Sequence, residues 1–404
     1  MNLYTAQWWT GFDRCDGRVR SGYFLSSSAG EGMIAFRGAC TRSHWYRHVR
    51  ADRDIEPAVS SALIQPMRLV SLALAASLVL PVAVVFAQGA PPPATLPPTP
   101  SRSYDRQLEI LEKKVDDLEW RARTEDIAVM DKWWITSPKP ARTDNPKGQG
   151  AGNPLKIPVY SFTPKSLGAK KGPLLILIHG YVHGSFDRYY SHILRELLEQ
   201  GYVVVAPEYR GSTGYGGELY DAIDYGGAEI DDVKAARDWA VETLPNVDPA
   251  RVGVLGWSHG GYQTLYQAFN YPDAYKVAYA GVPVSDLIQR MGYKGPGYQS
   301  TFTQFIGKSA IDDPAEYRRR SPVNSVDKLR IPLLIHTNTI DEDVNVMEVE
   351  HLIEALKAAG KKFEYKIYDA APGGHEFNRI DTRLAKESRK EIWAFLARYL
   401  HPGA

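Results

Sequence analysis

A serine with the surroundings of a nucleophile, Ser258, lies in the run GWSHGG over residues 256–261. The run has the form G-x-S-x-G and follows an apolar segment, residues 252–255, that predicts a buried strand. A serine nucleophile stands on a tight strand-to-helix turn, where side chains two residues to either side would clash, so glycines are needed there. Residues 262–268, which follow, are compatible with a helix. The pattern therefore predicts a nucleophilic serine rather than an ordinary serine in a glycine-rich turn.

A serine nucleophile needs a general base, an acid that orients the base, and donors for the oxyanion. In a doubly wound sheet these groups come from loops at the carboxyl ends of strands, in the chain order serine, acid, histidine. His375 lies in a glycine-containing loop after the predicted strand 363–367, and we expect it to be the base. Two aspartates follow the predicted strand 333–336: we expect Asp341 to be the acid, with Asp343 as the alternative.

The oxyanion donors are expected to be two backbone N–H groups. One belongs to His259, the residue after the nucleophile, and the other comes from the loop after the predicted strand 174–178. By its position in that loop, Tyr181 is the expected second donor, and Gly180 permits the turn.

Strand and helix patterns alternate from about residue 132 onward, which is typical of an α/β fold. Continuous apolar runs at 174–178 and 202–206 predict central parallel strands. Pro158, in a predicted strand at 157–162, suggests an edge strand. Further strands are predicted at 133–136, 252–255, 276–280, 333–336 and 363–367, and helices near 190–200, 230–244, 260–270, 346–359 and 381–399. We therefore expect a mostly parallel, doubly wound sheet flanked by helices over residues 131–404.

An apolar segment inside the chain has the form of a secretory signal peptide. Residues 67–87 have a basic start, an apolar run and small residues before Gln88. Because this segment is internal, we expect translation to start at Met67 and residues 1–66 to be a mis-annotated upstream leader. The alternative is a signal anchor, since the apolar stretch could just span a bilayer. The expected location is secreted or periplasmic, with no integral membrane role unless the segment stays as an anchor.

A Pro-rich linker, residues 88–103, and a charged helix, about 104–130, follow that segment. The helix carries apolar residues at 3-4-3 spacing, which cover fewer than three heptads. We therefore expect it to dock on the main domain rather than to form a coiled coil, and the oligomeric state stays open. The four apolar residues are Leu108, Leu111, Val115 and Leu118.

Composition and charge exclude several classes of protein. A formal net charge of +1 gives no reason to expect nucleic acid or an anionic membrane surface as partner. The only cysteines, Cys15 and Cys40, precede the predicted domain, so it has no disulfide framework or zinc cluster. His179 and His183 lack a third ligand at suitable spacing, so no metal site is expected. The glycines of 211–217 do not form a phosphate loop, and no cofactor is expected.

Several motifs are distributed over residues 130–402. They are IHG at 178–180, YRGSTGYG at 209–216, RVGVLGWSHGGY at 251–262, Tyr317, Ser321-Pro322, PLLIH at 332–336 and GH at 374–375. Together they resemble the catalytic domain of the prolyl oligopeptidase family of serine peptidases. The resemblance implies an α/β-hydrolase fold with Ser258 as nucleophile, His375 as base and Asp341, three residues before Val344, as acid. Thr337 stands where most relatives have glycine, which keeps the alternative acid open.

Departures from the family bear on the substrate. Larger members carry a β-propeller ahead of the catalytic domain, and the stretch between residues 87 and 131 is too short for one. Residues 284–290 lack the aromatic side chains that line proline-selective pockets, so no proline preference is expected. We expect a lid at about 287–325, whose aromatic residues either form pocket walls or pack within the lid. These aromatic residues are Tyr293, Tyr298, Phe302 and Phe305.

The expected function is a serine hydrolase that cleaves amide bonds of small peptides through an acyl-enzyme. A carboxylesterase, or another acyl-ester hydrolase, would use the same three residues and is the alternative. A non-catalytic binding protein on the same fold is the third hypothesis. The intact order Ser258, Asp341, His375 argues against this third hypothesis.

Overall fold

The computed structural model describes the backbone of residues 5–12 and 19–26, and residues 104–142, 147 and 149–403 with their side chains. The chain divides into two compact units, Met1–Gly89 and Ala90–Ala404. The second unit contains the predicted α/β domain together with the charged helix that precedes it.

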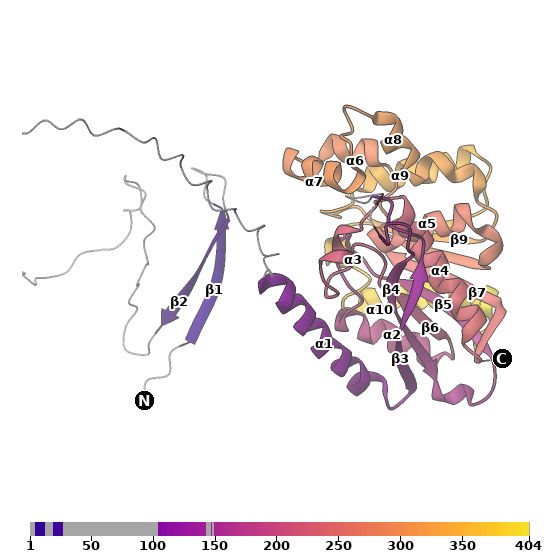
Figure 1. Cartoon of the computed structure of the whole chain (residues 1–404). Helices are drawn as coiled ribbons and strands as arrows, with labels where there is room; N and C mark the ends of the chain where they lie inside the picture. Colours follow the sequence, from indigo (N-terminus) through magenta and orange to yellow (C-terminus); the bar gives the residue numbers. More distant parts are fainter. Residues whose placement is uncertain (1–4, 13–18, 27–103, 143–146, 148, 404) are drawn as a thin grey trace, which may run out of the picture. The chain divides into compact units, whose positions relative to one another are not determined.

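An eight-stranded sheet forms the centre of the second unit (Figure 1). Its strand order is β10-β9-β8-β7-β5-β6-β4-β3. The six strands from β5 to β10 pair in parallel, whereas β4 pairs antiparallel with β6 and β3 antiparallel with β4. The strands are β3 (Ala128–Ser137), β4 (Leu155–Pro164), β5 (Gly172–Ile178), β6 (Val203–Pro207), β7 (Val247–Trp257), β8 (Val277–Gly281), β9 (Leu333–Asn338) and β10 (Glu364–Tyr368). This confirms the predicted mostly parallel sheet.

Helices cover both faces of this sheet, because its central strands are apolar on both sides. In β5, Leu174 and Ile176 enter one buried cluster with residues of α4, α5 and α9, while Leu175 and Leu177 enter the other with α1, α2 and α10. The helices are α1 (Tyr104–Thr124), α2 (Ser191–Glu199), α3 (Gly217–Asp221), α4 (Ala228–Thr243), α5 (His259–Asn270), α6 (Leu287–Tyr293), α7 (Pro296–Ile306), α8 (Pro314–Arg319), α9 (Val346–Ala358) and α10 (Arg383–Leu400).

The region predicted as a lid, about 287–325, consists of short helices inserted between β8 and β9. Helices α6, α7 and α8 gather at one end of the domain, seen at the top of Figure 1. A 3₁₀ segment, Pro322–Lys328, then leads the chain back to the sheet.

Pro158 does not mark an edge strand, contrary to the prediction. Its strand, β4, lies between β6 and β3, so β3 is the edge. The regular β4–β6 ladder begins only at Val159, one residue further along. The carbonyl of Pro158 still accepts a hydrogen bond from the N–H of Glu208 on the β6 side. Pro158 has no N–H with which to return this bond, so the ladder on the β6 side ends at the proline.

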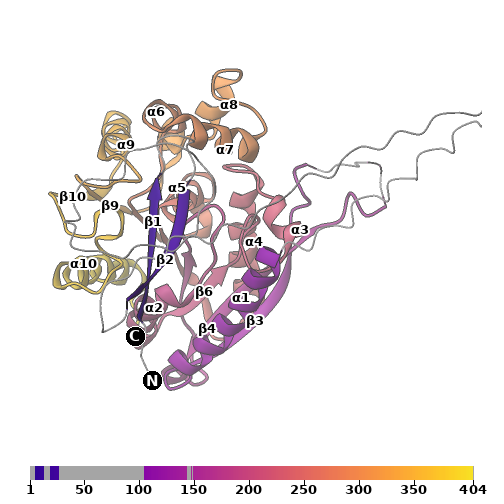
Figure 2. The ribbon, with the colours of Figure 1, turned by 90° about the vertical axis from the view of Figure 1, so that its left-hand side faces the viewer.

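Helix α1 docks on the domain as expected, but through the face opposite to its apolar stripe, and it ends at Thr124 rather than near residue 130. Figure 2 shows α1 lying along β3. Its buried residues are Lys113, Asp116, Trp120 and Thr124. Trp120 stacks on Phe186, with ring centroids 4.8 Å apart. The four apolar residues at 3-4-3 spacing are all exposed.

The first unit contains a two-stranded antiparallel sheet, β1 (Thr5–Phe12) with β2 (Val19–Ser26), which the sequence did not predict. Most of the predicted leader, the signal-like segment 67–87 and the linker 88–103 lie outside the described residues. Within the described part of the chain, no helix has the length and apolar character needed to cross a bilayer.

Candidate active site

Ser258 occupies a strained turn between β7 and α5. Its backbone angles, φ 58° and ψ −120°, are rare for a residue with a side chain. Two glycines let the chain turn so tightly. A Cβ on Gly256 would lie 2.5 Å from the backbone of Gly260, and a Cβ on Gly260 would lie 2.3 Å from the carbonyl oxygen of Ile178. The glycine requirement predicted from the sequence is therefore met by two close backbone approaches.

His375 and Asp341 form a hydrogen-bonded pair on adjacent strand loops. His375 Nδ1 lies 2.9 Å from Oδ1 and 2.8 Å from Oδ2 of Asp341, whose side chain is fully buried. Oδ1 of Asp341 also accepts from the backbone N–H groups of Asp343 and Val344. Because Nδ1 donates to this carboxylate, the lone pair of the neutral imidazole is on Nε2, where a general base needs it.

The strand order brings the three predicted residues to the carboxyl-terminal edge of the sheet, where its parallel strands end. Ser258 follows β7, Asp341 follows β9 and His375 follows β10, and these strands lie in the order β10-β9-β8-β7 with all their pairings parallel. The intervening strand β8 is tied to both sides at this edge. The N–H of Ser258 donates to the carbonyl of Gly281, and that of Val282 donates to the carbonyl of His336.

Two residues that the sequence did not single out hold the acid and base loops together. The side-chain amide of Asn338, at the end of β9, donates to the carbonyls of Ala371 and Gly374 in the histidine loop. A carboxylate oxygen of Glu342 accepts from the backbone N–H of His375. The sequence could have indicated the asparagine, because it is a polar residue at the carboxyl end of a predicted strand. The glutamate stood in an acidic cluster where solvated charges are the usual expectation.

Asp343, the alternative acid, belongs to a different set of contacts. Its carboxylate receives hydrogen bonds from Arg290 and Lys294 of the lid region. Its Oδ2 lies 3.8 Å from Nε2 of His375, on the far side of the ring from Asp341. Burial opposes its ionisation, but Arg290, Lys294 and His375 outweigh burial and lower the pKa of Asp343. The geometry thus gives the orienting position to Asp341 and attaches Asp343 to the lid.

The two residues expected to donate to the oxyanion lie at the start of α5 and in the loop after β5. His259 is the first residue of α5, where a helix leaves its N–H groups without an intrahelical acceptor. Tyr181 has a positive φ of 61° in the loop after β5. Its carbonyl oxygen, on the next peptide unit, accepts a hydrogen bond of 2.6 Å from the hydroxyl of Tyr209. The carbonyl oxygen of Gly180, which shares a peptide with the N–H of Tyr181, lies 2.8 Å from Nδ1 of His179. Burial raises the pKa of Tyr209 well above its ordinary value, so the hydroxyl stays protonated as a donor.

The lid aromatics are mainly packing and hydrogen-bonding residues. Phe302 is buried, with its ring centroid 4.7 Å from that of Tyr225 and 4.8 Å from that of Tyr298. The hydroxyl of Tyr298 accepts a hydrogen bond from Arg290, and that of Tyr293 donates to Glu348. These rings pack within the 287–325 region and also against residues outside it: Phe302 on Tyr225, and Phe305 with its ring centroid 5.0 Å from that of His183. Their role as pocket walls stays a prediction.

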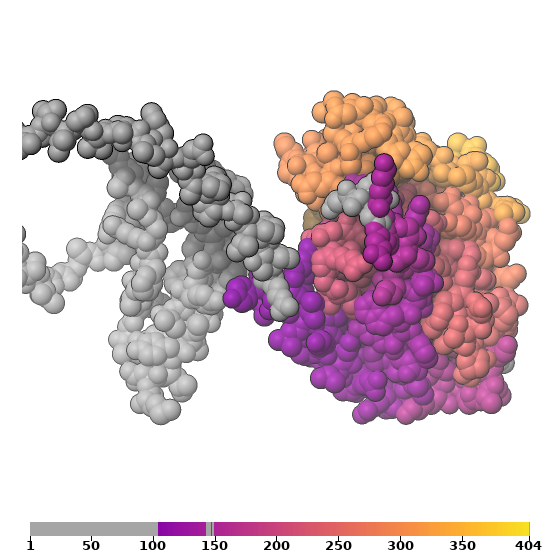
Figure 3. All heavy atoms as spheres, viewed as in Figure 1, coloured from indigo at the N-terminus to yellow at the C-terminus, as the bar shows by residue number. Residues whose placement is uncertain are grey.

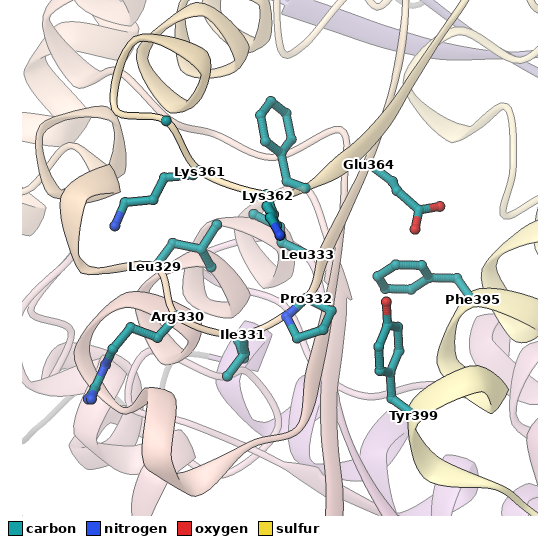
Figure 4. Close-up of a pocket in the computed structure, with 12 residues that line it drawn as sticks. Leu329, Arg330, Ile331, Pro332, Leu333, Lys361, Lys362, Glu364, Phe395 and Tyr399 are labelled. Atoms are coloured by element: carbon teal, nitrogen blue, oxygen red, sulfur yellow. The ribbon is translucent and has the colours of Figure 1, made fainter.

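A cavity of about 540 Å³ lies at the opposite edge of the sheet, where β9 and β10 begin (Figure 4). Its lining includes Leu333 and Glu364, the first residues of β9 and β10, whereas the acid and base follow the last residues of these strands. It is therefore separate from the candidate site. Within the described part of the chain, no group of three His, Cys, Asp or Glu side chains is placed to hold a metal ion.

Comparison with known proteins matches residues 188–403 to the model of the prolyl oligopeptidase family. This region is more than half of the chain and contains the candidate triad. The chain belongs to the prolyl oligopeptidase family. One relative, described as an uncharacterized peptidase YuxL of Bacillus subtilis, is 34% identical over 215 residues, which is 52% of this chain and 32% of that protein.

A second relative in the family is an acylamino-acid-releasing enzyme of Arabidopsis thaliana. It is 27% identical over 256 residues, covering 61% of this chain and 33% of the relative. The match thus spans about a third of the length of these relatives. Among solved structures, the uncomplexed acylaminoacyl peptidase of Pyrococcus horikoshii superimposes with a TM-score of 0.58 at 20% identity, over 69% of this chain and 43% of that one. This likeness shows the α/β-hydrolase fold.

Proposed function

We propose that this prolyl oligopeptidase family member is a serine peptidase that cleaves amide bonds of small peptides through an acyl-enzyme. The observation that carries the proposal is the buried Asp341–His375 pair, at the same sheet edge as the strained turn of Ser258. The names of related proteins support the amide bond as the target: an acylamino-acid-releasing enzyme and a dipeptidyl aminopeptidase are among them.

In the proposed reaction, Ser258 Oγ attacks the substrate carbonyl carbon while its proton passes to Nε2 of His375. Asp341 holds the imidazole in the required tautomer and stabilises the imidazolium that forms. The N–H groups of His259 and Tyr181 stabilise the negative charge on the carbonyl oxygen. His375 then gives its proton to the leaving amine, and a water molecule hydrolyses the acyl-enzyme by the reverse sequence of proton transfers.

The test is a substrate profile of one purified sample against short peptide amides and against aryl esters, together with Ser258→Ala. We expect turnover of peptide amides, and a loss on the order of 10⁴-fold or more in kcat in the variant with its fold intact. Turnover of esters alone would point to the carboxylesterase alternative. Absence of turnover and of labelling at Ser258 by a fluorophosphonate would point to a non-catalytic binding protein.

We further propose that the protein acts outside the cytoplasm, secreted or in the periplasm, because residues 67–87 have the pattern of a signal peptide. N-terminal sequencing of the protein from the extracytoplasmic fraction tests this. A mature start just after residue 87 is the expected result. A chain found only in the cytoplasm, or one that begins upstream of Met67, would contradict it.

A further inference from the structure

Helix α1 presents a continuous apolar stripe to solvent, on the side opposite its docked face. The fractional exposures on this stripe include 57% for Leu111 and 69% for Leu118. An α-helix turns by about 100° per residue, so these positions lie roughly opposite the buried Lys113 and Trp120. Figure 3 shows α1 at the surface of the domain. The full stripe is Tyr104, Leu108, Leu111, Val115 and Leu118, and the exposed Ala122 continues it.

The spacing of the stripe is that of a coiled-coil seam. Its members follow one another at intervals of 4, 3, 4, 3 and 4 residues from Tyr104 to Ala122, which corresponds to alternating d and a positions of a heptad. A surface helix that only docks on its own domain has no need of a second apolar face. This helix has both, because its docked face is made of other residues.

The polar residues beside the stripe are sorted by charge. The e positions are acidic, and the g positions are basic or neutral. Among the residues that the structure describes, Glu112, Lys114 and Arg121 have no ion-pair partner, while Glu119 lies 3.5 Å from Arg188 and 3.9 Å from Arg123. The e residues are Asp105, Glu112 and Glu119, and the g residues are Gln107, Lys114 and Arg121.

This charge sorting selects one occupant and one orientation. In a parallel pair of helices each g residue faces an e residue of the other helix, so Lys114 meets Glu119 of the second copy twice by symmetry. In an antiparallel pair e faces e and g faces g, which would bring acid to acid and base to base. A groove of about 830 Å³ lies beside the acidic flank and is lined by both acidic and basic side chains, among them Glu112, Asp187 and Arg188.

We propose that α1 pairs with α1 of a second copy of this chain as a parallel two-helix coiled coil, with the two catalytic domains on opposite sides of the seam. The coiled coil is short, but each helix is already held on its own domain. Lys113 forms buried ion pairs with Asp116 of the same helix and with Glu208 of the domain. A parallel pair also brings residue 104 of both chains to the same end.

The first test is the mass of the full chain in solution, measured by light scattering over a series of concentrations. We expect twice the chain mass for the native sequence, and one chain mass for Leu111→Glu at the same concentrations. Ile311→Glu is the matched control, because Ile311 is an exposed apolar residue far along the chain from α1, and it should leave the dimer intact. A native chain of single mass throughout, or a dimer that Leu111→Glu leaves unchanged, overturns the proposal.

The second test uses the charges. Lys114→Glu and Glu119→Lys should each weaken self-association at least tenfold, because each places two like-charged pairs across the seam. An equimolar mixture of the two variants should associate again, since the mixed pair restores opposite charges at both positions. Failure of the mixture to associate, while each variant stays folded by circular dichroism, contradicts the proposed pairing.

The third test fixes the orientation, in a background in which Cys15 and Cys40 are changed to serine. Leu118→Cys should form a disulfide-linked dimer under mild oxidation, because parallel helices place residue 118 of both chains side by side. Crosslinking of a Leu108→Cys chain to a Leu118→Cys chain, with neither crosslinking to itself, would show antiparallel helices and overturn the parallel arrangement. These readouts do not depend on enzymatic activity, so the proposed function and the dimer can fail separately.

Discussion

The sheet edge that carries the candidate triad of Ser258, Asp341 and His375, called the triad edge below, and helix α1 both contain residues with a conspicuous spacing in the sequence. The spacing has different consequences in the two regions. At the triad edge the spacing constrains the backbone: Gly260 must lie against Ile178 for Ser258 to stand on its turn. In α1 the spacing concerns side chains alone, and either face of a helix can dock. A motif whose residues are required by a close approach of two backbone segments therefore locates a site. A periodic spacing of apolar residues predicts a helix, but it does not say which face of the helix packs against its own domain.

The strongest test of the triad edge separates its two aspartates. Asp341→Asn should lower kcat/KM by about 10⁴-fold, because the amide would favour the wrong tautomer of His375. Asp343→Asn should cost less than about tenfold, since Asp343 contacts Arg290 and Lys294 of the lid rather than Nδ1. Steady-state kinetics on peptide amides measure both. A larger loss for Asp343→Asn would assign the orienting role to Asp343 instead.

The backbone constraint itself can be broken with one methyl group. Gly260→Ala would place a Cβ 2.3 Å from the carbonyl oxygen of Ile178, so α5 and the end of β5 must separate. A displacement of about 1 Å at the nucleophile costs on the order of 10²-fold in activity, and we expect a lower Tm as well. Gly292→Ala is the matched control for Tm, because a Cβ there meets nothing within 4 Å. Equal melting temperatures for the two variants would refute the close-approach explanation.

The two faces of α1 should differ sharply in their effect on folding. Trp120→Ala removes a fully buried ring stacked on Phe186 and should lower the free energy of unfolding by about 3–5 kcal/mol. Leu118→Ala, on the exposed stripe, should change it by less than about 0.5 kcal/mol when measured at a dilution at which the chains are separate. Denaturant unfolding of both variants decides the matter. Similar losses would mean that the stripe is buried against the domain.

Acid should weaken the attachment of α1. Burial opposes ionisation of Glu208, but the charge of Lys113 and the side-chain hydrogen bond with His179 outweigh burial and lower its pKa from 4.5 to about 2. A carboxyl group with a lowered pKa in the folded state stabilises the fold above its unfolded value, and this contribution is lost as the pH falls from about 4.5 to 2, by up to about 1.4 kcal/mol per pH unit. Glu208→Gln should lower Tm at neutral pH and flatten the dependence of Tm on pH below 5. A parallel loss of Tm on acidification in both proteins would contradict this role.

The sequence was sufficient for the parts of the site that depend on local patterns. Ser258 and His375 lie at the carboxyl ends of apolar strands, and the chain order of the triad limits the acid to one cluster. The choice between Asp341 and Asp343 depended on which side of the imidazole each one reaches, and that is a property of the folded loops. The roles of Asn338 and Glu342 depend on contacts between segments more than thirty residues apart, which spacing along the chain cannot reveal.

In the fold, the sequence predicted all eight strands of the main sheet and the other helices, but it missed β1, β2 and the helices α3, α6, α7 and α8, and it misplaced one strand. Pro158 suggested an edge because proline cannot donate to a ladder, yet it lies at the very end of the β4–β6 ladder, where a missing donor is tolerated. The inward face of α1 escaped prediction for a related reason. The sequence did not single out Lys113 and Asp116, and only the fold brings Lys113 to the buried Glu208.

The most direct test of the central claim is labelling of the native protein with a fluorophosphonate probe, followed by identification of the modified residue by peptide mass. A serine activated by the His375–Asp341 pair on a strained turn should react with one equivalent of probe. We predict that the label is on Ser258, that Ser258→Ala abolishes it, and that Asp341→Asn greatly slows it. A folded native protein that takes up no label, or one labelled at another serine while Ser258→Ala keeps its activity, would contradict the account.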